Sequence, residues 1–153
     1  MNRLVKYVIT MGLFVALTLP VNTNAQPNEG QLGLTTNGSG VSASYMLSNN
    51  LRVNAGLNLG FGDDYTMFGI NGGAWLYQPA QANLATYLGG GFNFTSTSSG
   101  PFDSSNLTLN AVYGAEYFIA SSFSANVHLR TDLDFDPFRI GFGTGMGLTW
   151  WIQ

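Results

Sequence analysis

The sequence contains no cysteine, so neither a disulfide nor a lipid-bearing N-terminal cysteine contributes to the structure. It is also poor in charge, since Asp, Glu, Lys and Arg make up 8% of its 153 residues, whereas a typical soluble domain has about 25%. Exported soluble domains of this size often rely on disulfides. The two absences together argue against an ordinary water-soluble secreted domain.

Basic residues are especially scarce. Arg3 and Lys6 lie at the very N-terminus. The rest of the chain has only three basic residues, Arg52, Arg130 and Arg139, against eight acidic ones. A chain with this balance lacks the basic patch that attracts nucleic acid or anionic lipid. We therefore expect no nucleic-acid partner.

Long apolar runs are missing as well, because nothing after residue 25 approaches the roughly 20 apolar residues of a membrane-spanning helix. The apolar run Tyr7 to Leu19 is too short for such a helix. Basic residues precede it, and Thr23-Asn24-Ala25 offers small residues for cleavage, as in an export signal. The sequence predicts a signal peptide over 1–25 that is removed on export, and one domain over 26–153.

The exported part instead alternates apolar and polar residues with the period of two that is typical of β-strands. From Leu51 to Phe61 every odd-numbered residue is apolar, while the even-numbered residues are Arg, Asn or Gly. Eight such segments are predicted, the first, second, fourth and fifth less clearly than the others: 31–37, 41–48, 51–61, 67–77, 84–95, 107–119, 123–135 and 138–152.

The predicted connections differ in length. Those at one end of the strands, near 49–50, 78–83 and 120–122, are short. At the other end the segment 96–106 is long and polar, whereas its neighbours near 37–40, 62–66 and 136–137 are short. In an even-stranded barrel with its N-terminus in the periplasm, 96–106 lies on the outer side. We expect it to be the one external loop that is long enough to extend away from the barrel.

The polarity of the two faces distinguishes a soluble barrel from a membrane-embedded one. A soluble barrel points its apolar residues inward and its charged residues at water. Here the apolar face is broad, and the other face carries mostly Gly, Asn, Ser and Thr. Aromatic residues near the strand ends predict two lipid-facing girdles: Tyr45, Trp75, Tyr77, Tyr117, Phe123 and Trp150 in one, and Phe61, Phe94, Phe135 and Phe138 in the other.

Lipid offers no hydrogen-bond partner to a strand edge, so such a sheet must close on itself. The sequence therefore predicts an all-β fold, an eight-stranded antiparallel transmembrane up-and-down β-barrel whose apolar face contacts lipid.

This pattern resembles the small outer-membrane β-barrel proteins, typified by the OmpA transmembrane domain and OmpX, over the whole exported part. The resemblance implies a location in the outer membrane of a Gram-negative bacterium and a non-catalytic role in envelope structure or surface interaction. It further implies contact with outer-membrane lipid and lipopolysaccharide, assembly by the barrel-insertion machinery, a monomeric state and no cofactor.

Several charged residues fall on the predicted inward face. The interior of an eight-stranded barrel is just wide enough for side chains, and charges there must be paired. We expect internal ion pairs that plug the lumen, with Glu116 bound to Arg52 or to Arg130. The predicted lumen polar network consists of Arg52, Glu116, His128, Arg130, Asp132 and Arg139.

Two other functions stay open at this point. Some small outer-membrane barrels are lipid A-modifying enzymes with a Ser/His/acid set near the membrane boundary. His128 is the single histidine, but Arg130 stands where that pattern wants a serine, and His128 falls on the polar face. The other alternative is a soluble secreted β-barrel or sandwich that binds an apolar ligand. We assign no catalytic residue.

Two further motifs give no site. Asp132, Asp134 and Asp136 have the spacing of the start of a calcium loop, but its sixth position is Pro137 and its twelfth is Gly143, not Gly and Glu. We assign no metal site to them. The glycines at 141, 143, 145 and 147 have strand spacing, and we expect them to face inward and accommodate bulky side chains.

Overall fold

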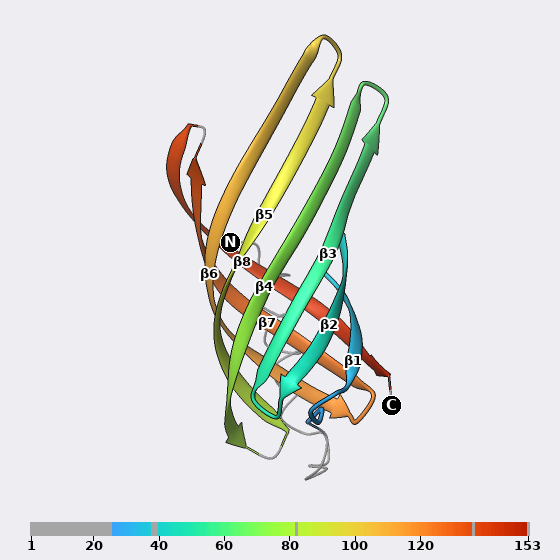
Figure 1. Ribbon diagram of the computed structural model, residues 1–153, viewed down its shortest axis with the longest axis vertical. Coiled ribbons are helices and arrows are strands. Elements are labelled where there is room, and N and C mark those ends of the chain that lie inside the picture. The colour runs from blue at the N-terminus through green and yellow to red at the C-terminus, as the bar shows by residue number, and fades with distance from the viewer. Residues whose placement is uncertain (1–25, 38–39, 82, 136, 153) are drawn as a thin grey trace, which may run out of the picture.

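The computed structural model describes residues 26–37, 40–81, 83–135 and 137–152, so the predicted signal peptide lies outside the described residues. Consecutive strands pair antiparallel, and the first also pairs with the last, which closes the sheet into a barrel (Figure 1). The strands are β1 (Leu32–Thr36), β2 (Gly40–Ser48), β3 (Leu51–Gly62), β4 (Tyr65–Gln81), β5 (Leu84–Ser99), β6 (Phe102–Ala120), β7 (Phe123–Phe135) and β8 (Phe138–Ile152). The predicted eight-stranded antiparallel barrel is confirmed.

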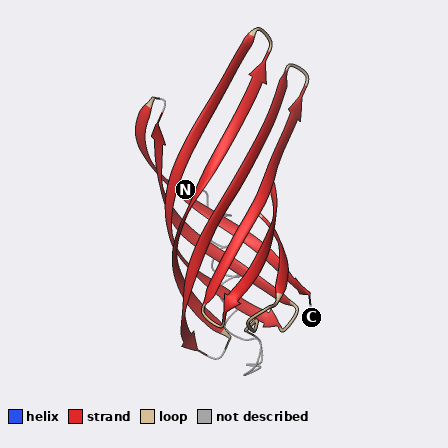
Figure 2. Ribbon diagram, viewed as in Figure 1, coloured by secondary structure: helices blue, strands red, loops and turns tan. Residues whose placement is uncertain are grey.

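Figure 2 shows only strands and connecting loops in the described ranges. Within them, no helix is long and apolar enough to cross a membrane.

The two faces of the wall have the polarity that the sequence predicts. On β3, Leu57 and Leu59 are about half exposed, whereas Arg52 is fully buried inside. On β6, Leu109 and Tyr113 point outward and Glu116 is fully buried. The outside of the barrel is therefore apolar at these positions, and its inside holds the charged side chains of Arg52 and Glu116.

Most aromatic residues of the predicted girdles face outward, but Trp75 and Tyr77 do not. Trp75 is the cross-strand partner of Arg52, and directly paired residues share a face, so its ring lies inside the barrel. Tyr77 is 6% exposed. The prediction for these two was wrong because Gly and Asn interrupt the apolar alternation before them, at 69–73. The outward members with the greatest exposure are Tyr45, Phe61, Phe135, Phe138 and Trp150.

The predicted external loop 96–106 is also wrong, because these residues form a β-hairpin. Ser96 pairs with Ser105, and only 100–101 separate β5 from β6. Gly100 has φ +58°, a left-handed conformation that glycine adopts without strain. Serine and threonine stay in the strands here because β4 continues beside them, as in the pair Thr66 and Ser98.

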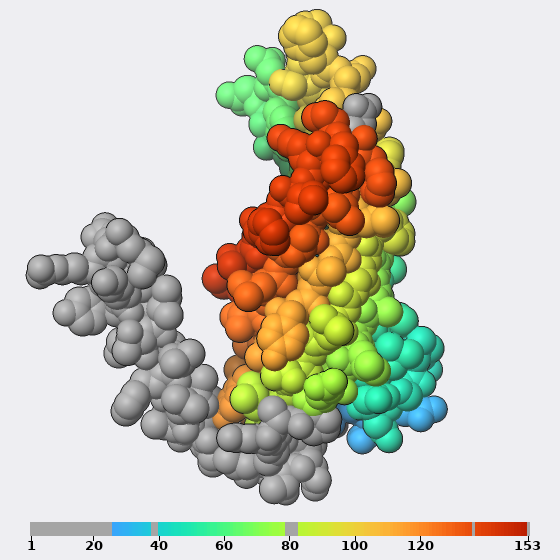
Figure 3. All heavy atoms as spheres, turned by 90° about the vertical axis from the view of Figure 1, so that its left-hand side faces the viewer, coloured from blue at the N-terminus to red at the C-terminus, as the bar shows by residue number. Residues whose placement is uncertain are grey.

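The hairpins β3–β4 and β5–β6 reach farther than β7–β8 (Figure 1). In the space-filling view their tips, green and yellow, project beyond the body of the molecule (Figure 3).

The wall is lower beside β8. β1 is short and pairs with β8 only from Thr36 opposite Leu148 to Leu32 opposite Ile152. Among the described residues, positions 138–147 of β8 therefore pair with β7 alone.

Candidate functional site: the barrel lumen

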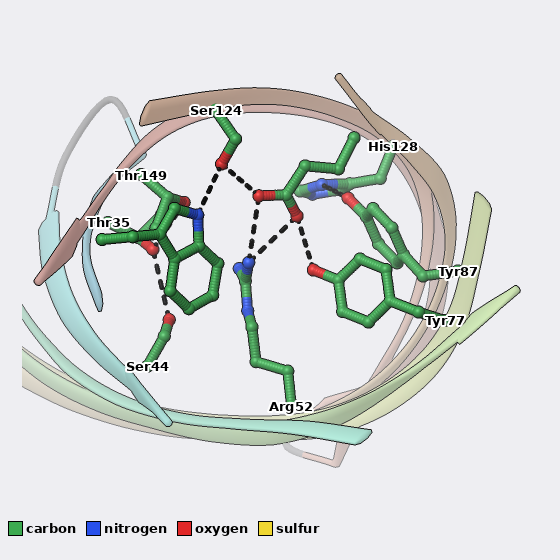
Figure 4. A network of polar contacts seen from close by, with 10 residues as sticks. Thr35, Ser44, Arg52, Tyr77, Tyr87, Ser124, His128 and Thr149 are labelled. Carbon is green, nitrogen blue, oxygen red and sulfur yellow. Dashed lines mark hydrogen bonds and ion pairs between the residues drawn. The ribbon is translucent and has the colours of Figure 1, made fainter. Parts of the chain in front are cut away.

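A buried ion pair crosses the lumen at the end where β8 finishes. Arg52 lies near the start of β3 and Glu116 near the end of β6, and Arg52 Nη1 is 3.0 Å from Glu116 Oε2 with both side chains 0% exposed. Figure 4 shows Arg52 reaching from one wall into the centre of the barrel. Of the two partners expected for Glu116, the structure pairs it with Arg52.

The carboxylate of Glu116 accepts hydrogen bonds at both oxygens. The Tyr77 hydroxyl donates to Oε2 at 2.5 Å, and the Ser124 hydroxyl donates to Oε1. Ser124 is held in turn by the indole N–H of Trp151, at 3.0 Å from its Oγ. Hydrogen bonds to an ionised carboxylate are stronger than neutral ones, so this set fixes the carboxylate in one position. We call Arg52, Tyr77, Glu116, Ser124 and Trp151 the plug.

Aromatic rings surround the guanidinium of Arg52. Its Cζ lies 4.0 Å from the ring centroid of Trp75 and 5.5 Å from that of Trp151. Arg52 Nε and Nη2 have no hydrogen-bond partner among the described residues. Cation–π attraction therefore stabilises the side of the guanidinium that Glu116 does not reach.

Aromatic rings from β4 to β6 pack beside the plug. Trp75 and Tyr87 are stacked, with ring centroids 4.8 Å apart, and Tyr87, Tyr77 and Phe118 belong to one buried cluster. On the opposite side Thr35 bonds to both Ser44 and Thr149 (Figure 4). This end of the lumen is filled by side chains.

His128 lies just above the plug, inside the barrel. Its Nδ1 is 3.2 Å from the hydroxyl of Tyr87, and its ring packs over Gly145 of the neighbouring strand. Its hydrogen-bond partner is thus a phenol. A catalytic triad instead needs a serine on one side of the histidine and a carboxylate on the other.

The remaining charged residues of the predicted network lie farther from the plug and form ion pairs of their own, one of them with Asp134, which the prediction did not include. Arg130 Nε is 2.9 Å from Asp132, and Arg139 Nη2 is 3.7 Å from Asp134. The two arginine side chains are 47% and 70% exposed. The structure therefore separates the predicted network into the buried pair Arg52–Glu116, His128 above it, and exposed pairs toward the opposite rim.

These acids do not form a metal centre in the part of the chain that the structure describes. No group of three His, Asp or Glu side chains that could hold a metal ion occurs there. Asp136 lies outside the described residues, and Asp134 accepts hydrogen bonds from Thr108 and Asn106.

Between the plug and the projecting hairpins the lumen is hollow. A cavity of about 480 Å³ extends from the level of His128 up to that of Thr95. We call it the asparagine cavity, because asparagines of five successive strands line it: Asn54, Asn58, Asn71, Asn93, Asn110 and Asn126.

No protein-family model and no curated protein sequence matches the chain. Its structure is similar to the crystal structure of the N-terminal β-barrel domain of Pseudomonas aeruginosa OprF, with a TM-score of 0.60 and 13% identity over 80% of this chain and 94% of that one. It is also similar to Neisserial surface protein A (NspA), with a TM-score of 0.51 and 18% identity over 78% and 92%. The fold is that of the small eight-stranded outer-membrane barrels. Ail of Yersinia pestis matches with a TM-score of 0.47 and 15% identity over 79% and 91%.

Sequence reasoning missed the aromatic part of the lumen in this outer-membrane-type barrel. Tyr87, Phe118 and Trp151 are each 1% exposed, although their residue types were expected on the lipid side. Strand parity could have placed two of them inside, since Phe118 follows Glu116 by two residues and Trp151 lies between the outward Trp150 and Ile152.

Proposed function

We propose that the exported chain is an integral, non-catalytic β-barrel of the bacterial outer membrane that contributes to envelope structure or surface interaction. One observation carries the proposal: Leu57, Leu129 and many other large apolar residues are exposed on the outside, while Arg52 and Glu116 are fully buried within. Soluble monomers rarely expose apolar patches of more than a few hundred Å². Lipid is the solvent that such a surface fits.

The extent of the apolar surface supports this proposal. The strands β3 to β8 have 12 to 19 residues each, and about 9–11 tilted residues cross a bilayer. Above Phe94 and Leu107 the outward side chains become polar, with Ser96, Ser98 and Ser105. The hairpin β5–β6 therefore extends out of the hydrocarbon layer into water.

The lumen supports a structural role over the two alternatives. His128 bonds to a phenol inside the barrel, where the catalytic base of a lipid-modifying enzyme would need a serine and a carboxylate as partners. The asparagine-lined cavity is a poor site for an apolar ligand, because entry of such a ligand would cost the amides their hydration. The description of NspA as a surface protein fits the same location.

The proposal includes partners that follow from this location. The outward belt would contact outer-membrane lipid and lipopolysaccharide, the barrel-insertion machinery would assemble the chain, and the barrel would act as a monomer.

Fractionation tests the proposal. The full chain, expressed with its own N-terminus in a Gram-negative host, is expected in the outer-membrane fraction, with a gel mobility that changes on heating. A polypeptide over 26–153 that is folded and monomeric in detergent-free buffer would contradict it. A changed lipid A structure in cells with the wild-type chain, absent with His128→Ala, would favour the enzyme alternative instead.

A further inference from the structure

The turns of the two projecting hairpins contact each other and form one surface at the end of the molecule. The backbone N–H of Gly100, in the β5–β6 turn, donates to the backbone oxygen of Asp64, in the β3–β4 turn, at 3.2 Å. The bond holds the two turns side by side, and both project beyond the body of the barrel (Figure 3). We call the aromatic and acidic side chains at these turns the tip surface: Asp63, Asp64, Tyr65, Phe102 and Asp103.

The two aromatic side chains of the tip surface are exposed but do not face lipid. Phe102 is 76% exposed and Tyr65 is 39% exposed. Tyr65 pairs with Ser99, and Ser99 pairs with Phe102, so the three residues share one face of the sheet. It is the inward face, because Asn110 on the same strand as Phe102 lines the lumen cavity and faces alternate with a period of two. The lipid-facing belt therefore does not account for these rings.

Every charged residue of the tip surface is acidic. Asp63, Asp64 and Asp103 are exposed, and the segments 59–69 and 94–107 contain no lysine, arginine or histidine. The ion pairs of the described residues all lie on the inward face of the barrel and do not include these three acids. Asp103 accepts a hydrogen bond from Ser98 at 2.7 Å, which leaves its charge uncompensated. The turns thus present a negative charge that no residue of the chain neutralises in the part that the structure describes.

This combination of groups suits a cationic partner. Carboxylates attract a cation, and the face of an aromatic ring does so as well. An anionic partner would be repelled. An apolar partner would remove the carboxylates from water without offering them a counter-ion. Arginine and lysine side chains fit best, because they carry a charged end on an aliphatic stem that packs against a ring.

The spacing of the rings favours a polypeptide over a small ammonium ion. Tyr65 on β4 and Phe102 on β6 lie on either side of β5, which separates them by about 10 Å at the usual strand spacing. Small ammonium ligands are recognised by several rings around one centre, and rings on strands this far apart do not form such a cage. A chain that carries several cations can reach both rings and the carboxylates together.

We propose that the tip surface docks an arginine- and lysine-rich segment of a protein outside the cell. The cationic ends of the segment pair with Asp63, Asp64 and Asp103, and their stems pack on Tyr65 and Phe102. The inference rests on the proposed function, because it needs these turns to face the outside of the cell. It gives the surface interaction a partner of stated chemistry.

Fluorescence anisotropy of labelled peptides tests the proposal. The full chain is expressed with its own N-terminus, and the barrel is purified from outer membranes into micelles of an uncharged maltoside detergent. Three short peptides alternate glycine with arginine, with glutamine or with glutamate. We expect the arginine peptide to bind with a dissociation constant of about 10 μM at low salt, and more weakly at about 0.5 M NaCl, where exposed charges are screened. The other two peptides should not bind measurably.

Variants locate the binding surface. Asp63→Asn combined with Asp64→Asn should weaken binding about threefold to tenfold by removing two exposed ion pairs, and Phe102→Ala about threefold by removing a cation–π contact. Glu29→Gln is the matched charge control, because Glu29 is exposed beside Asn49 at the opposite end of the barrel. Phe142→Ala is the matched aromatic control, since Phe142 is 84% exposed on the outside of β8. Both controls should bind as wild type does, and heat-dependent gel mobility shows that each variant folds.

The outcomes decide the proposal. Salt-sensitive binding that both tip variants weaken and both controls leave unchanged supports it. It is overturned if the controls weaken binding as much as the tip variants do, if Phe102→Ala binds as wild type does, or if the glutamine peptide binds as tightly as the arginine peptide.

The same experiment separates this inference from the function on which it rests. A chain that reaches the outer membrane but binds no arginine peptide overturns the inference alone. A chain that is absent from the outer-membrane fraction overturns the proposed function and the inference with it.

Discussion

Glu116 is the residue on which the plug depends most. Its carboxylate neutralises Arg52 and accepts hydrogen bonds from Tyr77 and Ser124, all of them buried. Removing one member of a buried ion pair leaves an unpaired charge and costs about 3–5 kcal/mol. We expect Glu116→Ala to lower the free energy of unfolding by that amount, measured by urea titration in micelles.

A double variant distinguishes the free-energy cost of an unpaired buried charge from the cost of lost packing. Replacing both charges, in Arg52→Met with Glu116→Leu, should recover most of the lost stability, because well-packed apolar groups often replace a buried ion pair at little cost. Arg139→Ala is the control, since its pair with Asp134 is exposed and such pairs contribute little. If Glu116→Ala were no more destabilising than Arg139→Ala, the assigned importance of the plug would be wrong.

Gly145 and Gly143 lie two residues apart on the inner face of β8, but only one has a close neighbour. A methyl group at Gly145 would collide with the His128 ring, whereas at Gly143 it would lie 3.9 Å from Arg130 Nη2. We expect Gly145→Ala to destabilise the barrel by about 1–3 kcal/mol through overpacking. Gly143→Ala should be neutral or slightly stabilising, because alanine restricts the unfolded chain.

The same urea titration measures both glycine variants. Adding His128→Ala to Gly145→Ala should relieve the collision, so that the two changes are not additive. Additive effects would show that the ring of His128 does not occupy the space above Gly145. A methyl group at Gly147 would also be crowded, by the backbone oxygen of Thr36 and the amide of Asn126, whereas at Gly141 it would make only an ordinary contact with Asp132.

At the scale of the strand, alternation predicted the elements whose outward positions are nearly all apolar. β3 and β8 show this, and the structure gives them almost the predicted bounds. In β4 the pattern fails between Gly69 and Gly73, and the sequence prediction therefore gave Trp75 and Tyr77 the wrong face. Their place inside follows from the register with β3, which the turn after β3 determines.

Composition also misled at the hairpin β5–β6. Serine, threonine and glycine are frequent in loops, but the residues at 96–106 gain backbone partners from β4 on one side and from each other. Likewise, period-two alternation assigned Arg52, Glu116 and Arg130 to one face but could not choose the pairing. The choice depends on the position of each residue along the barrel axis. Arg52 and Glu116 lie at the same level on this axis and therefore meet.

Ser99, at the tip of the β5–β6 hairpin, tests which end of the strands faces the outside. In intact cells, Ser99→Cys should react with a membrane-impermeant thiol reagent, and the chain has no other cysteine to compete. Ser121→Cys is the control, because Ser121 lies in the exposed β6–β7 turn at the opposite end. It should react only after the cells are opened. Labelling of Ser121→Cys alone in intact cells would show that the barrel is inserted the other way.

The inside-out distribution of polarity governs the whole molecule, and adjacent residues on β3 test it. Leu57 lies on the outside near the middle of the strand, 52% exposed, whereas Asn58 faces the cavity and bonds to Asn93. A cation at the midplane of a lipid-facing wall costs about 2–4 kcal/mol, so Leu57→Arg should lower the yield of folded barrel in vesicles and its stability to urea. Asn58→Asp should cost less, because the aqueous cavity keeps the new charge hydrated and the carboxylate can still accept a hydrogen bond. In detergent-free buffer the order would reverse for a soluble barrel, since an arginine at position 57 would then meet water. Equal tolerance of the two changes in vesicles would mean that the outward face of β3 does not contact lipid.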